Sequence, residues 1–309
     1  MEKNSTVKQS SKRARVRARG PITIGMDLGD RTSRYCVLDE NGEVEAEGSV
    51  ATTKTGMAAR FAGLGRCRIA IEVGTHSPWV SRLLSSFGHE VIVANARQVR
   101  LISASSRKDD RMDAETLARL ARVDPQLLRP IRHRGEEAQQ ALWVIRARAE
   151  LVEVRTSLVN AVRGLAKSAG ERLPSCDADT LRVERLAPLP EGLREPLTPL
   201  MREVESLTEK IQEYDRQVEQ IARREYPETQ LLRQVSGVGA LIALTFVLTV
   251  EDAGRFEKSR DVGCYVGLRP KRSESGERQP QLRITKEGDI YLRKLLVQGA
   301  HCSKGRTAS

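Results

Sequence analysis

The sequence predicts an α/β domain at its N-terminus, followed by a helical coiled-coil region and a small, mostly helical C-terminal domain. Three observations carry this prediction. Short β-branched apolar runs alternate with helical patterns up to residue 122, heptad-spaced apolar residues follow, and an apolar helix then precedes a basic, glycine-containing stretch. We divide the chain into a basic tail (1–20), an α/β domain (21–135), a helical region (136–227) and a C-terminal domain (228–309).

The tail is strongly basic and poor in apolar residues. Within eight positions it carries Lys12, Arg13, Arg15, Arg17 and Arg19. Charge repulsion without a hydrophobic core predicts disorder. Two interpretations of this segment stay open, a phosphate-binding arm and an unstructured extension.

The α/β domain reads as strands and helices in a recognisable order. Strands are predicted over 22–29, 68–74 and 89–95, a hairpin turning at Asn41-Gly42 over 33–50, and helices over 54–64, 76–88 and 110–122. Pro78 near the start and Gly88 at the end bound the second helix. The order β-ββ-α-β-α-β-α is that of the RNase H fold, which we take as the predicted class.

The helical region contains two long helical patterns. One covers 138–166, and the other is a seam of alternating three- and four-residue steps through Leu197, Leu200, Val204, Leu207, Ile211, Tyr214, Val218 and Ile221. Between them, residues 170–196 contain Pro174, Pro188, Pro190 and Pro196, which predict a loop or short helices. The two helices are expected either to pack as an antiparallel hairpin or to offer the seam to a second chain.

The C-terminal domain combines a glycine turn with a basic stretch. Gly237 and Gly239 flank Val238 before an apolar helix, as in a helix-hairpin-helix turn whose backbone N–H groups face a DNA phosphate. The alternative is a tight turn between two helices. Further phosphate contacts are predicted at Arg269, Lys271, Arg272, Lys286 and Arg293.

Composition points to a polyanionic partner. The net charge is +11, and nucleic acid is the commonest partner of such a chain. Aromatic residues make up 4% of the chain, which argues against a surface built mainly on base stacking. The absence of an apolar stretch near 18 residues argues against a membrane span. Five scattered cysteines and four histidines argue against a zinc site, and we expect reduced cysteines in a cytoplasmic, nucleoid-associated protein.

Four acidic residues are placed where carboxylates are unusual. Asp27 and Glu72 lie in apolar strand sequences, where an acid is costly to bury unless it is paired or bound to metal. Asp110 and Asp113 are three apart in a helical pattern and share a face, although spacing alone does not exclude Asp109 in place of Asp110. Oxygen ligands suit magnesium or manganese, ions that assist phosphoryl transfer.

Ordered motifs resemble those of the insertion-sequence-110 family of transposases. They are IGMDLG, IEVGTHSPW and KDDRMDA, then GVG, RF, YVGLRP, SESG and ITKEGDIYLRKLL, together spanning about residues 22–300. The resemblance implies a RuvC-like domain with an acidic tetrad and a C-terminal serine domain. It assigns Asp27, Glu72, Asp110 and Asp113 to a Mg²⁺ (or Mn²⁺) site, with Lys108 at the head of the third motif.

The same resemblance implies a reaction. Ser275, which precedes Gly276, is the expected nucleophile, with Ser273 as the alternative because this chain has Glu274 where many members have a second hydroxyl residue. The serine would form a covalent phosphoserine link to DNA, assisted by the metal-bound tetrad. A homo-oligomer (dimer or tetramer) and a guide RNA from the element are the other expected partners.

Other interpretations stay open from the sequence. A Holliday-junction-type endonuclease would use the tetrad without rejoining DNA, and a decayed, truncated copy would only bind DNA. The segment IGMDLGDRTS also resembles the first phosphate loop of sugar kinases and actin-like ATPases, but no second Asp-x-Gly loop begins a strand.

Overall fold

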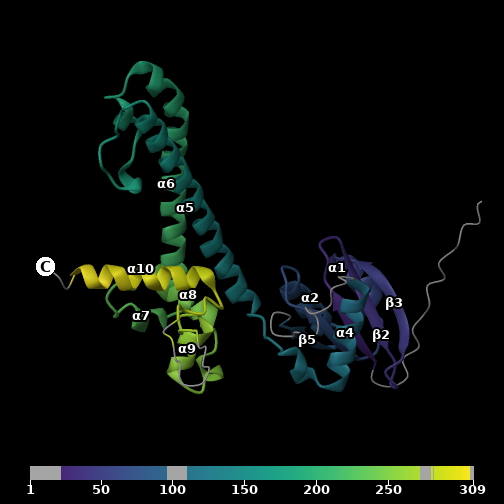
Figure 1. Ribbon diagram of the computed structural model, residues 1–309. Helices are drawn as coiled ribbons and strands as arrows, with labels where there is room; N and C mark the ends of the chain where they lie inside the picture. Colours follow the sequence, from purple (N-terminus) through teal and green to yellow (C-terminus); the bar gives the residue numbers. More distant parts are fainter. Residues whose placement is uncertain (1–21, 96–109, 272–279, 281, 307–309) are drawn as a thin grey trace, which may run out of the picture. The chain divides into compact units, whose positions relative to one another are not determined.

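The computed structural model describes residues 22–95, 110–271, 280 and 282–306, and the chain forms two compact units, Met1–His133 and Arg134–Ser309 (Figure 1). The first unit contains every strand of the five-stranded sheet, and the second is helical. Across the part of the chain described, no helix is both long and apolar enough to cross a bilayer.

The sheet of the first unit is mixed. Its strands are β1 (Thr23–Asp27), β2 (Thr32–Leu38), β3 (Val44–Ala51), β4 (Arg68–Glu72) and β5 (Glu90–Ala94), in the order β3-β2-β1-β4-β5. The hairpin β2–β3 pairs antiparallel, β2 is antiparallel to β1, and β1, β4 and β5 run parallel. At the predicted Asn41-Gly42 turn, Gly42 has a φ of 84°, a conformation that glycine adopts readily. The α/β domain is confirmed, and its RNase H-like, RuvC-like class stays a prediction.

Helices cover both faces of this sheet. They are α1 (Lys54–Phe61), α2 (Ser77–Ser86) and α4 (Asp110–Val123), with the 3₁₀ turn η2 (Pro125–Leu128) after α4. The first begins where the Thr53 side chain accepts a hydrogen bond from the Gly56 amide, and it ends three residues earlier than predicted. The side chains of Ile24 and Ile71 pack with α1 and α2, whereas Ala70 packs with α4. Side chains therefore alternate between two cores along each strand.

Helix α4 lies directly on β1 because Gly25 has no side chain. A Cβ atom at Gly25 would lie 2.0 Å from the carbonyl oxygen of Ala114 and 2.4 Å from the amide nitrogen of Ala118. Both atoms belong to helix backbone, so neither moves without moving the helix. The approach of α4 to the sheet consequently depends on this glycine.

Substitution Gly25→Val is expected to destabilise the protein, because the added atoms force α4 away from β1. Overpacking against backbone costs roughly 1–3 kcal/mol or more. Thermal unfolding of Gly25→Val and of Gly63→Val, whose Cβ would meet nothing within 4 Å, provides the comparison. Equal midpoints for the two variants would contradict the close contact.

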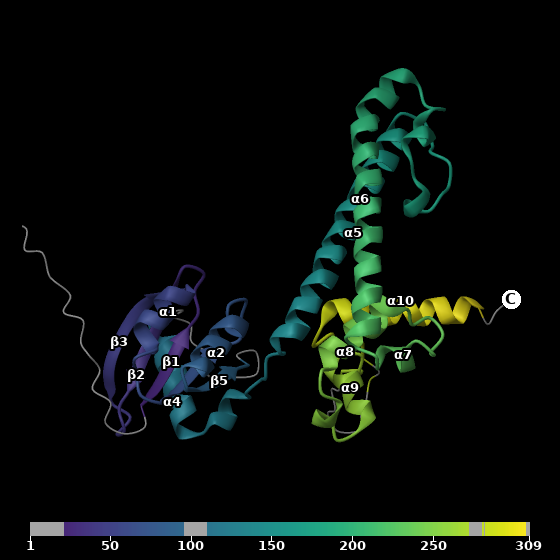
Figure 2. The same ribbon diagram turned by 180° about the vertical axis from the view of Figure 1, so that it is seen from behind.

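The second unit is built on a hairpin of two long helices, α5 (Glu136–Ser168) and α6 (Glu191–Arg224), drawn side by side in Figures 1 and 2. Ile145 near the start of α5 packs with Val218 near the end of α6, and Val162 packs with Met201 at the opposite end. The helices are thus antiparallel, which confirms the hairpin alternative. Most of the predicted seam is buried, as shown by Leu197, Val204, Leu207, Ile211 and Val218.

The prediction of a loop or short helices over 170–196 is wrong for its last six residues. The short 3₁₀ turns η3 (Ala178–Thr180) and η4 (Val183–Leu186) are present, but α6 begins at Glu191 and contains Pro196 and Pro199. Each proline removes one backbone hydrogen bond from the helix. Burial of apolar residues along this stretch of α6 offsets that loss, because tertiary packing contributes more to helix stability than local propensity does.

Five further elements follow α6 in the part of this unit that the structure describes. They are α7 (Thr229–Leu232), α8 (Ala240–Val250), η5 (Ala253–Arg255), α9 (Ser259–Tyr265) and α10 (Ile290–Arg306). Leu244 and Leu248 of α8 share a core with Leu142 of α5 and Val218 of α6. Helix α8 therefore packs where α5 starts and α6 ends. The finer division of this unit into domains stays a prediction.

Candidate metal and nucleic-acid sites

Asp27 and Glu72 end two neighbouring parallel strands. The register pairs Gly25 with Ala70 and Met26 with Ile71, so the next residues, Asp27 and Glu72, lie beside each other at the carboxyl edge of the sheet. Both residues are half-buried. Because side chains alternate along a strand, both carboxylates lie on the face that packs against α4.

Helix α4 brings a third carboxylate to this edge. Asp113 precedes Ala114, the residue whose carbonyl oxygen meets Gly25 of β1. Burial raises the pKa of Glu72, and the negative charge of Asp113 raises it further. Asp113 is therefore within electrostatic reach of Glu72, although the two residues are 41 positions apart.

Asp110 begins α4, three residues before Asp113, so its Cα lies on the same helix face. Its side chain, and all of Lys108 and Asp109, lie outside the described residues. We refer to Asp27, Glu72, Asp110 and Asp113 as the acidic edge.

The acidic edge has the chemistry of a site for a hard divalent cation. Within the described side chains, no group of three or more His, Cys, Asp or Glu is placed to hold a metal, and the Asp110 carboxylate is not among those side chains. The donors are all carboxylate oxygens, which suit magnesium or manganese. The negative charges of Glu72 and Asp113 repel each other, and a cation bound between them would offset this repulsion.

The raised pKa of Glu72 predicts a pH-dependent stability. A carboxyl group whose pKa is higher in the folded state than in the unfolded state stabilises the fold below its unfolded pKa, and this contribution is lost as pH rises through the folded pKa. Glu72→Gln is therefore expected to raise the unfolding midpoint at neutral pH without divalent metal. The gain should vanish below about pH 4.

Thermal unfolding between pH 3.5 and 8 in a chelator tests this prediction, at roughly half-unit steps near the usual glutamate pKa. Glu45→Gln, an exposed carboxylate on the edge strand β3, is the matched control. A Glu72→Gln curve parallel to that of Glu45→Gln at every pH would contradict the raised pKa.

The stretch that contains Ser275 is held at its base by paired backbone. Arg272, Ser273 and Ser275 lie outside the described residues. On either side, the Lys271 amide donates to the Arg283 carbonyl at 2.9 Å and the Thr285 amide donates to the Arg269 carbonyl at 2.8 Å. Pro270 and Ile284 form an antiparallel bridge. These two short segments bring the ends of the serine-containing stretch together.

The predicted basic contacts of this unit differ in exposure. Arg269, Lys271 and Lys286 are exposed, as a phosphate contact requires. Arg293 is buried, and its Nη1 donates to the carbonyl oxygens of Val266 at 2.8 Å and Glu287 at 2.7 Å. These two bonds hold the side chain within the unit, and a phosphate contact at Arg293 stays a prediction.

The glycine turn packs against the last helix. Gly237 has a φ of 83°, and a Cβ there would lie 2.2 Å from the carbonyl oxygen of Gly299 in α10. Gly239 is the N-cap of α8, with nothing within 4 Å of a Cβ position. Gly237 therefore shapes a tight turn, and the phosphate contact through Gly239 stays a prediction.

Sequence reasoning missed Gly25 and the structural role of Arg293. A glycine inside a strand is a signal of close backbone approach, but the sequence does not say which element approaches. The buried position of Arg293 has no local signal, because its acceptors are carbonyl oxygens reached only through the fold.

Comparison with known proteins gives concordant matches. Residues 24–169 match a family model described as a transposase and named for the DEDD domain of IS110 elements, and residues 229–308 match the model described as "Transposase IS116/IS110/IS902 family". A probable family 20 transposase of Pseudomonas aeruginosa is 28% identical, over 90% of this chain and 82% of its own length. The transposase for insertion sequence element IS1111A of Coxiella burnetii is 26% identical, over 90% and 76%. A putative transposase, y4qE, of Sinorhizobium fredii is 30% identical, over 90% and 70%.

Proposed function

The chain belongs to the IS116/IS110/IS902 family of transposases, and we propose that it breaks and rejoins DNA strands with the acidic edge as its divalent-metal site. One observation supports this use of the acidic edge above the others. Burial raises the pKa of Glu72, which ends a strand beside Asp27, and Asp113 on α4 lies close enough to raise that pKa further. Carboxylates held together against their own repulsion are suited to binding a cation.

The proposed site residues are Asp27, Glu72, Asp110 and Asp113, and the proposed ion is Mg²⁺ or Mn²⁺. When bound, the ion would supply positive charge to a phosphate oxygen during phosphoryl transfer. The chain's own contribution is to orient the carboxylates on rigid elements: two on strand ends and two on the first turn of a helix that lies directly on β1.

Ser275 is the proposed nucleophile. Its Oγ forms a bond to phosphorus, the bond from phosphorus to one deoxyribose oxygen breaks, and that oxygen leaves as a hydroxyl. The serine loses one proton and the leaving oxygen gains one, so the step is balanced. Attack by a hydroxyl end of another strand reverses the step and rejoins DNA. The paired segments at 269–271 and 283–285 support this role by joining the ends of the stretch that carries the serine.

The serine and the acidic edge belong to different units of the chain. We propose that the chain acts as a homo-oligomer, a dimer or a tetramer. Exposed Arg269, Lys271 and Lys286, together with Lys108, Arg272 and the turn at Gly239, are the proposed nucleic-acid contacts. A guide RNA is a further proposed partner, supported by the net charge of +11.

Strand breakage on a defined substrate tests the proposed function. The full chain is incubated with supercoiled DNA that carries the ends of its element, in magnesium and in a chelator. We expect magnesium-dependent nicking, DNA linked to protein, and rejoined products. Cleaved but never rejoined DNA would instead indicate a Holliday-junction-type endonuclease, and DNA binding without cleavage would indicate a non-catalytic copy.

A further inference from the structure

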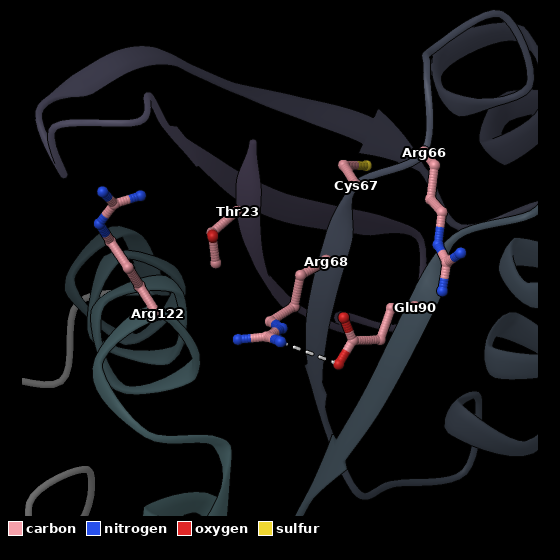
Figure 3. A pocket seen from close by; sticks show the side chains of 6 residues that line it. All are labelled: Thr23, Arg66, Cys67, Arg68, Glu90 and Arg122. Atoms are coloured by element: carbon pink, nitrogen blue, oxygen red, sulfur yellow. Dashed lines mark ion pairs between the residues drawn. The ribbon is translucent and has the colours of Figure 1, made fainter. Parts of the chain in front are cut away.

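A basic pocket lies at the end of the sheet opposite the acidic edge. Its volume is about 500 Å³, and Thr23, Arg66, Cys67, Arg68, Glu90 and Arg122 line it (Figure 3). Thr23, Arg68 and Glu90 are the first residues of β1, β4 and β5, whereas Asp27 and Glu72 are the last residues of β1 and β4. The basic pocket is thus separate from the acidic edge.

Positive charge dominates the basic pocket. Three arginines, Arg66, Arg68 and Arg122, line it together with a single acidic residue, Glu90. Burial raises the pKa of the Cys67 thiol to about 11, so this group is neutral near pH 7. In Figure 3 the Arg66 and Arg122 side chains lie on opposite sides of the Arg68–Glu90 ion pair.

Two of the arginines are held in place while keeping donors to spare. Arg68 pairs with Glu90 at 3.1 Å and donates to the Ala121 carbonyl at 3.0 Å, and Arg122 donates to the Asp39 carbonyl at 2.7 Å. A guanidinium has five N–H donors, so these contacts use only part of each group. Side chains already held in one conformation lose less entropy when they bind a ligand.

Arg66 is the accessible member of the set. It lies in the loop between α1 and β4 and is exposed, and among the described residues it has no hydrogen-bond or ion-pair partner. The fold does not explain its positive charge in the same pocket as two anchored arginines, because a neutral residue at this position would leave the described contacts of Arg68 and Arg122 unchanged.

We propose that the basic pocket binds a phosphate of the DNA backbone at a distance from the bond that is cut. Helix α4 carries Asp110 and Asp113 of the acidic edge at its first turn and Arg122 near its end, so roughly 14–18 Å of helix separate the two sites. Guanidinium groups match the geometry of phosphate oxygens, and a backbone contact positions DNA without reading its sequence. The proposal rests on DNA being the substrate, but not on the identity of the catalytic residues.

DNA binding without metal tests the basic pocket. The affinity of the full chain for a fluorescent duplex that carries the element's ends, and for an unrelated duplex, is measured in a chelator over a range of salt concentrations. Arg66→Ala is expected to lower the affinity for both duplexes by roughly tenfold. It should also lower the slope of log affinity against log salt concentration by about one. Lys54→Ala, an exposed basic residue at the start of α1 that loses the same charge, is the matched control.

Equal affinities and salt slopes for Arg66→Ala and Lys54→Ala would overturn the proposal. Arg66→Lys is expected to restore part of the affinity and Arg66→Glu to weaken it further. If Arg66→Ala lost affinity for a single-stranded RNA but not for duplex DNA, the assignment of the pocket to DNA would be overturned. Calorimetry with inorganic phosphate forms the last arm, since Arg66-dependent phosphate binding without any effect on DNA would assign the pocket to a free anion. The binding measurement requires neither metal nor turnover, so its failure would leave the proposed strand cleavage untouched, and Lys54→Ala is expected to cleave DNA at the parent rate.

Discussion

Replacement of Asp113 by asparagine is expected to lower the rate of DNA strand cleavage by roughly a hundredfold or more. Asp113 lies on the first turn of α4, and its charge acts on Glu72 at the end of β4. It therefore links the carboxylates of the helix to those of the strand ends. Asparagine retains the size of the side chain but removes the negative charge that a divalent cation needs. The measurement is nicking of supercoiled DNA at several magnesium concentrations.

Two controls separate lost chemistry from lost folding. Glu45→Gln removes an exposed carboxylate from β3 of the same unit and is expected to cleave DNA at the parent rate. Duplex binding in a chelator should be unchanged or slightly tighter for Asp113→Asn, because a negative charge has been removed. Parent-like cleavage by Asp113→Asn would exclude Asp113 from the site.

Replacement of Ser275 by alanine is expected to abolish the covalent DNA–protein link and the rejoined products. The Oγ atom is the proposed bonding partner of phosphorus, and alanine has no group that can replace it. The linked species is trapped by denaturing the reaction and is assigned by mass spectrometry of the attached peptide. DNA binding should remain, because the exposed arginine and lysine side chains around the paired segments are unaltered.

Ser273→Ala is the matched control for this experiment, since it removes the neighbouring hydroxyl of the same stretch. Parent-like products from Ser273→Ala and none from Ser275→Ala would assign the nucleophile. The reverse pattern would assign Ser273. Continued cleavage by both variants, with free DNA ends, would contradict a serine intermediate and favour attack by water.

Local pattern was sufficient to predict the sheet and most helices. Ile24 and Ile71 lie in short apolar runs, and the hairpin turns at Asn41-Gly42 with Gly42 at a positive φ. The same reasoning located the unusual carboxylates, because an acid at the end of an apolar strand is conspicuous. That Asp27 and Glu72 lie on one face of the sheet follows only from the parallel register of β1 and β4, which the structure supplies.

Features that depend on contacts between distant segments were not predictable in this way. Pro196 marked a loop in the sequence, yet packing of α6 against its neighbours keeps it within a helix. Arg293 lies in a basic stretch that suggested a phosphate contact, yet its side chain is buried and its Nη1 donates to two backbone carbonyls. Arg66 and Arg122 are far apart in sequence and line one pocket because α4 packs against β1.

Calorimetric titration of magnesium into the full chain tests the acidic edge most directly, because it requires neither DNA nor turnover. The parent protein is compared with the double variant Asp27→Asn/Asp113→Asn, which leaves Glu72 and Asp110 in place. Saturable binding by the parent, and binding weakened by roughly a hundredfold in the double variant, is the predicted result. The same affinity in both proteins, or no binding by the parent of either magnesium or manganese, would contradict a metal site at the acidic edge.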